Sequence, residues 1–318
     1  MIPNHALCRF SQAGTERLGL VMQDKLYDLT NRYGSFAGWL KAAAGRTLAA
    51  LSELLDTPAL DTPIGPAFAL EDGKSGLRLL APLDLQEVWA FGVTYEMSRA
   101  ARMRESDQPT IYGKVYEAPR PEIFFKATPH RVVGTGEAVG IRADSTWNVP
   151  EAELTIVMTP ALEIIGYTIG NDLSSRDIEG QNPLYLPQAK VYNRCCALGP
   201  YIRLAEPAFN PLALAVSCVI KRREQIVFTG QTNTSRIHRA LPDLAHYLGR
   251  CNSFPNGALG MTGTGIVPPD TFTLSAGDII EITFEGLGTL VNPVVELPVF
   301  KERNHGISDY RGTRSPSG

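Results

Sequence analysis

The sequence has few features of disulfide-stabilised or zinc-binding proteins. Its five cysteines are odd in number and include no Cys-x-x-Cys pair. A disulfide framework uses an even number of cysteines and a structural zinc site uses closely spaced pairs, so neither class fits. We therefore expect a reducing, cytoplasmic environment.

The chain also lacks the segments that would direct it to a membrane or to nucleic acid. No apolar run is long enough to cross a bilayer, and the first residues lack the basic-then-apolar order of a signal peptide. The 30 basic and 33 acidic residues leave a formal net charge of −3, which gives no general attraction for a polyanion. We expect neither partner, so a small anionic substrate has to be held by local cations or a metal ion.

The composition and spacing predict a globular protein of two units. Apolar residues make up 44% of the chain and charged residues 20%, close to globular averages. In the first unit, residues 1–80, short strand-like runs precede a helix expected from Ser35 to Leu55 and a linker rich in Pro, Gly and Asp. The second unit, residues 81–318, ends in a polar tail that we expect to be frayed from about residue 303.

The second unit is predicted to be α+β and mostly β. Only three helices are expected in it: Tyr95–Arg104, Ile237–Leu248 and a short one after Ser174. The expected strands are Val88–Gly92, Ile123–Lys126, Glu153–Met158, Ile164–Ile169, Leu214–Lys221, Gln225–Thr229, Asp278–Phe284 and Leu290–Leu297. Strands at this density predict a mixed, largely antiparallel sheet that curls on itself.

The main chemical signal is the pair Glu151 and Glu153. Residues two apart share one face of a strand, so these carboxylates project together, opposite an apolar face of Ala152, Leu154, Ile156 and Met158. Burying two like charges side by side is costly, and a hard cation such as Mg²⁺ or Mn²⁺ removes that cost. From spacing alone, a solvated strand edge is the simpler alternative.

A polar cluster follows, where the next predicted strand ends. Asp172 can be a turn residue or a third ligand, and Ser174 and Asp177 have the spacing of a capping box for a short helix, with Arg176 as the ion-pair partner of Asp177. Further on, Lys190 precedes a turn, where a lysine is usually a surface residue.

In their order along the chain, these motifs resemble the fumarylacetoacetate hydrolase family. The resemblance implies a curled mixed β-roll with a small N-terminal α/β domain, a divalent-metal site (Mg²⁺, or Mn²⁺ or Ca²⁺), a homodimer and 2-keto acid substrates. By position it makes Glu151, Glu153 and Asp172 the metal ligands and places Lys126, Lys190 and Thr264 near the substrate. The matching segments are 92–95, 124–126, 151–154, 166–167, 171–177, 190, 198–200 and 262–265.

One departure bears on the reaction. Hydrolytic and decarboxylating members of the family look like Gly-x-Asn-Tyr-x-x-His, with a glutamate shortly after that helps the histidine to activate water. Here Ser98 takes the histidine position and Ala101 the glutamate position, and a hydroxyl with no adjacent base cannot make that proton transfer. His130, from outside the segment, or Glu105 could substitute.

Three longer runs, residues 94–106, 115–126 and 178–190, look instead like the family's dehydratases of 2-keto-3-deoxy-pentonates. The resemblance implies loss of water to give 2,5-dioxopentanoate. We expect Lys190, with a lowered pKa, to take the C3 proton, Glu122 to act at the leaving hydroxyl, and Lys126 to face the substrate carboxylate or the metal's carboxylates.

Tyr95, Ser98, Arg99 and Thr264 complete the expected substrate site. Arg99 and Arg102 lie on one helix face and either grip a carboxylate or form surface ion pairs.

Three alternatives remain open at this stage. The first is a C–C bond hydrolase of an acylpyruvate or fumarylpyruvate, which shares the fold and metal but needs the missing histidine and glutamate. The second is an isomerase or decarboxylase of hydroxymuconate-type acids. The third is a catalytically inactive metabolite-binding protein, which would have no reason to keep a buried charge cluster.

Overall fold

The computed structural model describes residues 2–3, 5–47, 50–51, 54, 62–105 and 109–299. The tail from residue 303, for which we expect fraying, lies outside this range, as does part of the helix expected from Ser35 to Leu55. No helix in the described part of the chain has the length and apolar character needed to span a bilayer.

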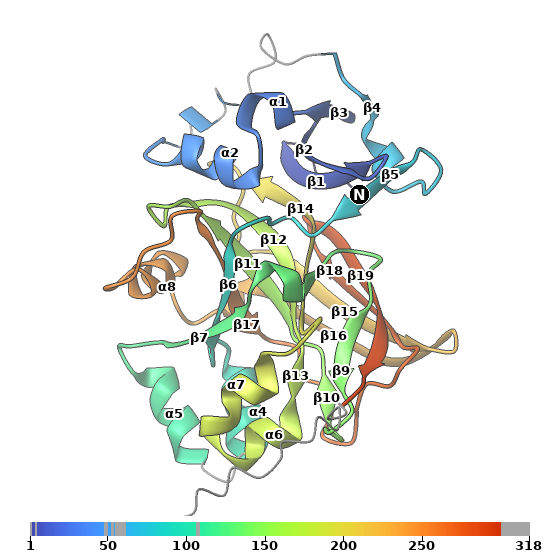
Figure 1. Cartoon of the computed structure of the whole chain (residues 1–318). Helices are drawn as coiled ribbons and strands as arrows, with labels where there is room; N and C mark the ends of the chain where they lie inside the picture. Colours follow the sequence, from blue (N-terminus) through green and yellow to red (C-terminus); the bar gives the residue numbers. More distant parts are fainter. Residues whose placement is uncertain are drawn as a thin grey trace, which may run out of the picture.

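A curled twelve-stranded sheet forms the centre of the molecule (Figure 1). Its strands follow the order β4-β3-β2-β1-β14-β12-β11-β17-β6-β7, with β5 paired to β1 and β8 to β14. Most pairs are antiparallel, but β6 runs parallel to β17 and β8 parallel to β14. The bounds are β1 Ala6–Gln12, β2 Thr15–Met22, β3 Lys25–Asp28, β4 Gly65–Pro66, β5 Leu77–Leu80, β6 Glu87–Gly92, β7 Glu122–Ala127, β8 Val132–Val133, β11 Ala152–Met158, β12 Ile164–Asp172, β14 Cys196–Leu204 and β17 Ala258–Thr264.

A five-stranded sheet in the order β16-β15-β18-β19-β9 lies beside the first, and β10 and β13 form a separate short pair. Strand β9 runs parallel to β19, so this sheet is mixed as well. The prediction of a mixed, mostly β fold is confirmed. The bounds are β9 Val139–Arg142, β10 Asn148–Val149, β13 Ser174–Ser175, β15 Ala215–Arg222, β16 Gln225–Asn233, β18 Ile279–Phe284 and β19 Gly288–Leu297.

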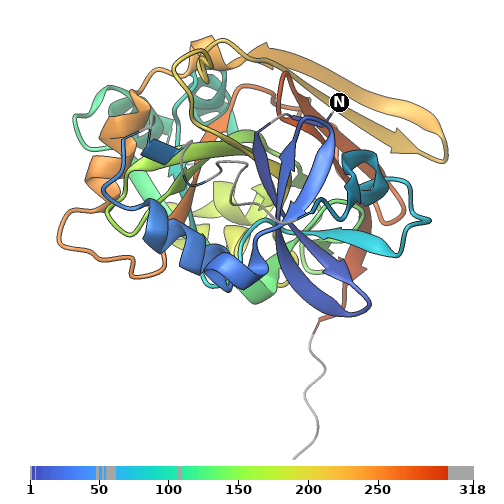
Figure 2. The ribbon, with the colours of Figure 1, turned by 90° about the horizontal axis from the view of Figure 1, so that it is seen from above.

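Most helices lie at the two ends of the strand structure, and α8 lies at its side (Figure 1). Figure 1 shows α4, α5, α6 and α7 together at the end opposite the N-terminal strands. Seen from above, α2 and the first strands lie over the other end (Figure 2). The bounds are α1 Thr30–Tyr33, α2 Phe36–Ala43, α4 Glu96–Glu105, α5 Pro109–Glu117, α6 Arg176–Gln181, α7 Leu186–Lys190 and α8 Leu241–Leu248.

The long N-terminal helix that the apolar stripe predicted is shorter in the structure. Helix α2 begins after Ser35, whose side chain accepts a hydrogen bond from Gly38 N, and it ends at Ala43. Gly45 then adopts a φ of +75°, which glycine tolerates better than other residues and which interrupts the helical path. Leu51 and Leu54 remain buried all the same, so their periodicity reflected burial and not a continuous helix.

Strand β11 lies deep inside the large sheet. All seven of its residues are buried, the apolar ones and the polar ones alike. It pairs with β12 on one side and with β17 on the other. A polar side chain on this strand is therefore removed from bulk water, which excludes the solvated-edge interpretation for Glu153.

Candidate metal centre and active site

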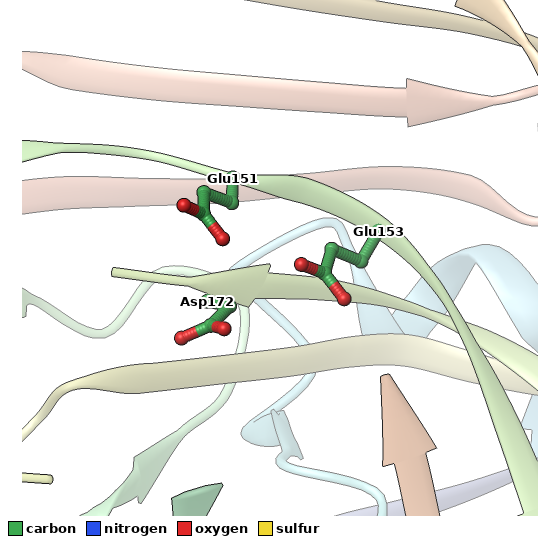
Figure 3. A group of neighbouring side chains, drawn as sticks. All are labelled: Glu151, Glu153 and Asp172. Carbon is green, nitrogen blue, oxygen red and sulfur yellow. The ribbon is translucent and has the colours of Figure 1, made fainter. Parts of the chain in front are cut away.

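Two neighbouring strands bring three carboxylates together. Glu151 directly precedes β11, Glu153 lies on β11, and Asp172 is the last residue of β12. Asp172 N donates a hydrogen bond to Glu151 O at 3.0 Å, which fixes the two strand ends side by side. One oxygen from each carboxylate lies within 4.8 Å of those of the other two (Figure 3).

The donor set fits a hard divalent cation. The three residues are 1–4% exposed, and their like charges lie close to one another with lysines and arginines nearby. Burial first, and then Asp172 and Glu151, raise the pKa of Glu153 well above its usual range. Mg²⁺ and Mn²⁺ prefer oxygen ligands, and binding either would offset this repulsion.

Lys126 lies on β7 with no exposed surface. Its ammonium donates to Leu173 O at 2.9 Å and Lys190 O at 2.6 Å, and lies 2.5 Å from Asp172 Oδ1. Burial alone would lower the pKa of Lys126, but the Asp172 carboxylate outweighs it and raises the pKa. The ammonium is thus held by two backbone hydrogen bonds and one ion pair. Lys126 therefore faces one of the three candidate metal-ligating carboxylates, Asp172.

Lys190, the last residue of α7, lies against the same carboxylates. Its Nζ donates to Glu151 Oε2 at 2.8 Å and to Asp172 Oδ2 at 3.1 Å. Burial opposes its charge, but Asp172 and Glu151 together raise its pKa. In the protein without a cation the pKa of Lys190 is therefore raised, because two carboxylates at hydrogen-bonding distance stabilise the charged form more than burial destabilises it. The expected lowering presupposed a metal ion beside the lysine and stays a prediction. The usual surface role of a lysine is excluded, since Lys190 is 2% exposed.

Glu122, at the start of β7, lines a cavity that is also lined by Glu151, Glu153, Asp172 and Lys190. Burial, followed by the charge of Glu179, raises the pKa of Glu122 to about 7. Its side chain occupies the space beside Gly92, where a methyl group would come within 1.9 Å of Glu122 Oε2. A carboxyl group with this pKa can hold a proton near neutral pH and release it.

Two arginines lie behind Glu151. For Arg102 the sequence left open a carboxylate contact or a surface ion pair, and for Arg176 it predicted a pair with Asp177. Arg102 on α4 and Arg176 on α6 donate to Glu151 Oε1 at 2.6 and 2.7 Å. Both also donate to Glu105 Oε2, at 2.7 and 2.6 Å. With side chains 8% and 2% exposed, neither is a surface residue. The i,i+3 pairs on α4 and α6 were visible in the sequence, but nothing there showed that the two helices meet.

The predicted capping box at the start of α6 does not form. The residue preceding the helix is Ser175, without a side-chain capping bond, and Ser174 Oγ instead donates to Glu179 Oε2 at 2.7 Å. Asp177 accepts hydrogen bonds from Ser145 and Thr146, so Arg176 is not its partner. Ser174 is directed inward because β13, to which it belongs, is fully buried.

Of the four expected substrate residues, two line the cavity and two do not. Ser98 and Thr264 line the cavity. Tyr95 is buried, and a methyl group on Gly265 would come within 2.6 Å of its ring. Arg99 forms ion pairs with Glu96 and Glu117 and does not line the cavity, so its surface interpretation holds and the expected substrate contact is not made in this structure.

The cavity is narrow, and no histidine of the described residues lines it. It has a free volume of about 20 Å³, room for about one water molecule. His130 is exposed and contacts Thr128, and Glu105 is held by the two arginines, so neither is placed to substitute for the missing base. A larger hollow beside α8, lined by Leu162 and Arg250, holds none of the three carboxylates.

Comparison with known proteins gives consistent matches. Residues 88–295 match the family model described as "Fumarylacetoacetate (FAA) hydrolase C-terminal". A Haloferax volcanii protein named "Probable 2-keto-3-deoxyxylonate dehydratase" is 44% identical over 282 residues, covering 89% of this chain and 96% of the relative. A Saccharolobus solfataricus protein named "2-dehydro-3-deoxy-D-arabinonate dehydratase" is 46% identical over 222 residues, covering 69% and 74%.

Solved structures agree with these matches. The structure described as "2-keto-3-deoxy-D-arabinonate dehydratase complexed with magnesium and 2,5-dioxopentanoate" has a TM-score of 0.78 and 37% sequence identity. The match covers 92% of this chain and 99% of that chain. The structural match therefore extends beyond residues 88–295.

Proposed function

This chain belongs to the fumarylacetoacetate hydrolase family, and on that basis we propose that it is a metal-dependent dehydratase of a 2-keto-3-deoxy-pentonate. The reaction removes one water and gives 2,5-dioxopentanoate. Two relatives at 44% and 46% identity carry the names of dehydratases of this type, and a similar solved structure contains magnesium and that product. The observation that carries the proposal is a cavity that joins three carboxylates, Lys190 and Glu122 and is lined by no histidine within the described chain.

Glu151, Glu153 and Asp172 are proposed to hold Mg²⁺. When bound, the ion supplies a Lewis acid that polarises the 2-keto group and makes the neighbouring C3–H bond acidic. The surrounding charges fit this assignment. Six carboxylates (Glu105, Glu122, Glu151, Glu153, Asp172 and Glu179) face four basic groups (Arg102, Lys126, Arg176 and Lys190) in and around the cavity, and if all are ionised two negative charges remain.

Lys190 is proposed to take the C3 proton. Its ammonium shares two carboxylate oxygens with the site assigned to the cation, so a divalent charge there weakens the attraction that raises the lysine's pKa. A neutral amine at this place then has a lone pair for the proton. Burial, which disfavours the ammonium, acts in the same direction.

Glu122 is proposed to protonate the C4 hydroxyl as it leaves. The C3–H and C4–O bonds break, a C3–C4 double bond forms, and the C4 oxygen departs as water with the proton from Glu122. Isomerisation of the resulting unsaturated alcohol to the aldehyde at C5 gives 2,5-dioxopentanoate. The protein's part is to hold one proton on Glu122 near neutral pH, which its raised pKa allows.

A substrate panel tests this proposal. Protein with Mg²⁺ is given both C4 epimers of 2-keto-3-deoxy-pentonate and an acylpyruvate, and the products are identified by mass spectrometry. We expect loss of one water from at least one epimer and no cleavage of the acylpyruvate. Cleavage of the acylpyruvate without any dehydration would instead identify a C–C bond hydrolase.

A homodimer and a cytoplasmic location belong to the same proposal. The homodimer rests on the family resemblance, and the cytoplasmic location rests on the odd number of unpaired cysteines. Sedimentation equilibrium of the purified protein tests the dimer, and a mass equal to one chain at micromolar concentration would exclude it. The division into an N-terminal domain of residues 1–80 and a catalytic domain from residue 81 likewise stays a prediction.

A further inference from the structure

Two of the three metal-binding carboxylates each have one oxygen engaged by a rigid donor of the protein. Glu153 Oε2 accepts a hydrogen bond from the backbone of Gly263 at 2.7 Å. Asp172 Oδ1 lies 2.5 Å from the ammonium of Lys126, which two backbone carbonyls hold in place. Each of these carboxylates therefore has one oxygen left, Oε1 of Glu153 and Oδ2 of Asp172.

In Glu151, too, the two carboxylate oxygens have different partners, and the oxygen that faces away from the site accepts two hydrogen bonds. Its Oε1 accepts from Arg102 Nη2 at 2.6 Å and from Arg176 Nη2 at 2.7 Å. Its Oε2 instead accepts from Lys190, which also contacts the remaining oxygen of Asp172. The Lys190 ammonium thus marks where a positive charge is stabilised, and the oxygens around that place are those that no other donor holds.

The two arginines cannot easily release Oε1, because each is fixed by two further carboxylates. Both contact Glu105 Oε2, and their Nε atoms lie 3.1 and 3.8 Å from oxygens of Glu179. The side chains of all four residues are at most 8% exposed. The charge-assisted hydrogen bonds to Glu105, at 2.7 and 2.6 Å, are short and strong, and water is not at hand to replace them.

The number of oxygens that a carboxylate can offer matters for the choice of cation. Ca²⁺ binds six to eight oxygens and often takes both oxygens of one carboxylate, whereas Mg²⁺ requires a near-octahedral set of six. We propose that Arg102 and Arg176 are positioning residues that make this site select Mg²⁺ over Ca²⁺, by restricting Glu151 to a single oxygen.

The inference rests on the proposed function only in taking the three carboxylates as the metal site. It adds that residues which touch neither metal nor substrate determine which metal binds. It also links helix α4, which carries Ser98 and Arg102, to the metal site, because Arg102 contacts the ligand Glu151 directly.

Isothermal titration of the chelator-treated protein with Mg²⁺ alone and Ca²⁺ alone tests the inference. We expect the wild type to bind Mg²⁺ more tightly. In Arg102→Gln we expect the ratio of the Ca²⁺ dissociation constant to the Mg²⁺ dissociation constant to fall about tenfold or more, since loss of a partner behind a ligand typically changes metal affinity about 10- to 100-fold. Arg78→Gln is the matched control, because it removes the same charge but Arg78 is exposed and pairs with Glu137, away from the cluster.

The ratio separates this role from simple charge removal, which changes the affinity for both divalent ions by the same factor. An unchanged ratio in Arg102→Gln, with normal folding by circular dichroism, overturns the inference. If that variant does not fold, Arg102→Lys replaces it, because one ammonium cannot reach the three carboxylates that the guanidinium contacts, and an unchanged ratio there has the same meaning. Absence of any metal binding to the wild type would count against the proposed function itself.

Discussion

Glu122 combines a position at the cavity with a pKa raised to about 7, so its protonation state changes within the working range of most enzymes. A nearby divalent charge lowers this value, so kcat should fall as pH rises, with an apparent pKa at or below about 7. A proton donor of this kind contributes about 10²- to 10⁴-fold to a rate. We expect Glu122→Gln to lower kcat by that factor and to lose the descending limb. A variant that keeps the wild-type pH profile would contradict the assignment.

A substitution at Gly92 offers a second test of Glu122, because it displaces the carboxylate without replacing Glu122 itself. A methyl group at residue 92 would lie 1.9 Å from Glu122 Oε2 and 2.5 Å from its carboxyl carbon, so Gly92→Ala must displace that side chain. We expect kcat to fall about tenfold or more while the Mg²⁺ affinity measured by titration changes little. Gly65→Ala, where an added methyl group meets nothing within 4 Å, should behave like the wild type. Full activity in Gly92→Ala would remove Glu122 from the mechanism.

At the scale of single residues, the sequence predicted the carboxylates better than their partners. Glu151 and Glu153 are two residues apart, and the alternation of faces along a strand is enough to predict that their carboxylates lie on the same side. The positions of Arg102 and Arg176 depend on contacts between helices that lie far apart in the chain, and spacing carries no information on such contacts. The same limit applies to Lys190: its burial was foreseen, but not the short distances to Glu151 and Asp172 that raise its pKa in the protein without a cation.

Among the secondary-structure elements, β7 joins the core to the site through Lys126. Lys126→Met would leave Asp172 Oδ1 without its ion-pair partner and two buried carbonyls without their donor. Breaking a buried ion pair by removing one member costs about 3–5 kcal/mol. Urea unfolding in the presence of a chelator should show a loss of this size.

Lys114 on α5 provides the matched control for that loss. It is exposed, so Lys114→Met should change the free energy of unfolding by no more than about 0.5 kcal/mol. If both variants are as stable as the wild type, Lys126 does not hold the site together.

Two central strands were absent from the sequence-based prediction, and their composition explains why. Strand β14 contains Gly199-Pro200, and proline usually marks an edge or a turn. Strand β17 contains two glycines, which weaken a strand signal, yet Gly263 is needed there: its φ is +86° and its N–H binds Glu153. Strands near a site follow its geometry as much as their own propensity.

At the scale of the whole molecule, the N-terminal strands continue the sheet that carries the site, because β1 pairs with β14 and β14 pairs with β12. Metal binding should therefore stabilise the entire fold. At a free Mg²⁺ concentration 100 times the dissociation constant, linkage predicts about 2.7 kcal/mol of added stability. Thermal or urea unfolding with and without Mg²⁺ measures it.

Glu153→Gln should remove most of the stabilisation by Mg²⁺ and make the metal-free protein more stable. The pKa of Glu153 is raised in the folded protein, so without metal its ionised form destabilises the fold and stability falls as pH rises above the unfolded value of about 4.5. At neutral pH the metal-free variant should thus be more stable than the metal-free wild type, and it should gain little from Mg²⁺. A variant that gains as much as the wild type would show that the ion binds elsewhere.

The central claim is that these three carboxylates make dehydration depend on a divalent ion. The most direct measurement is the rate of 2,5-dioxopentanoate formation from 2-keto-3-deoxy-pentonate, followed as Mg²⁺ is restored to chelator-treated wild type and Glu153→Ala. We expect the wild type to recover activity with saturating dependence on Mg²⁺ and the variant to remain inactive at the same concentrations. Full dehydration by Glu153→Ala, or by the wild type in chelator, would contradict the account.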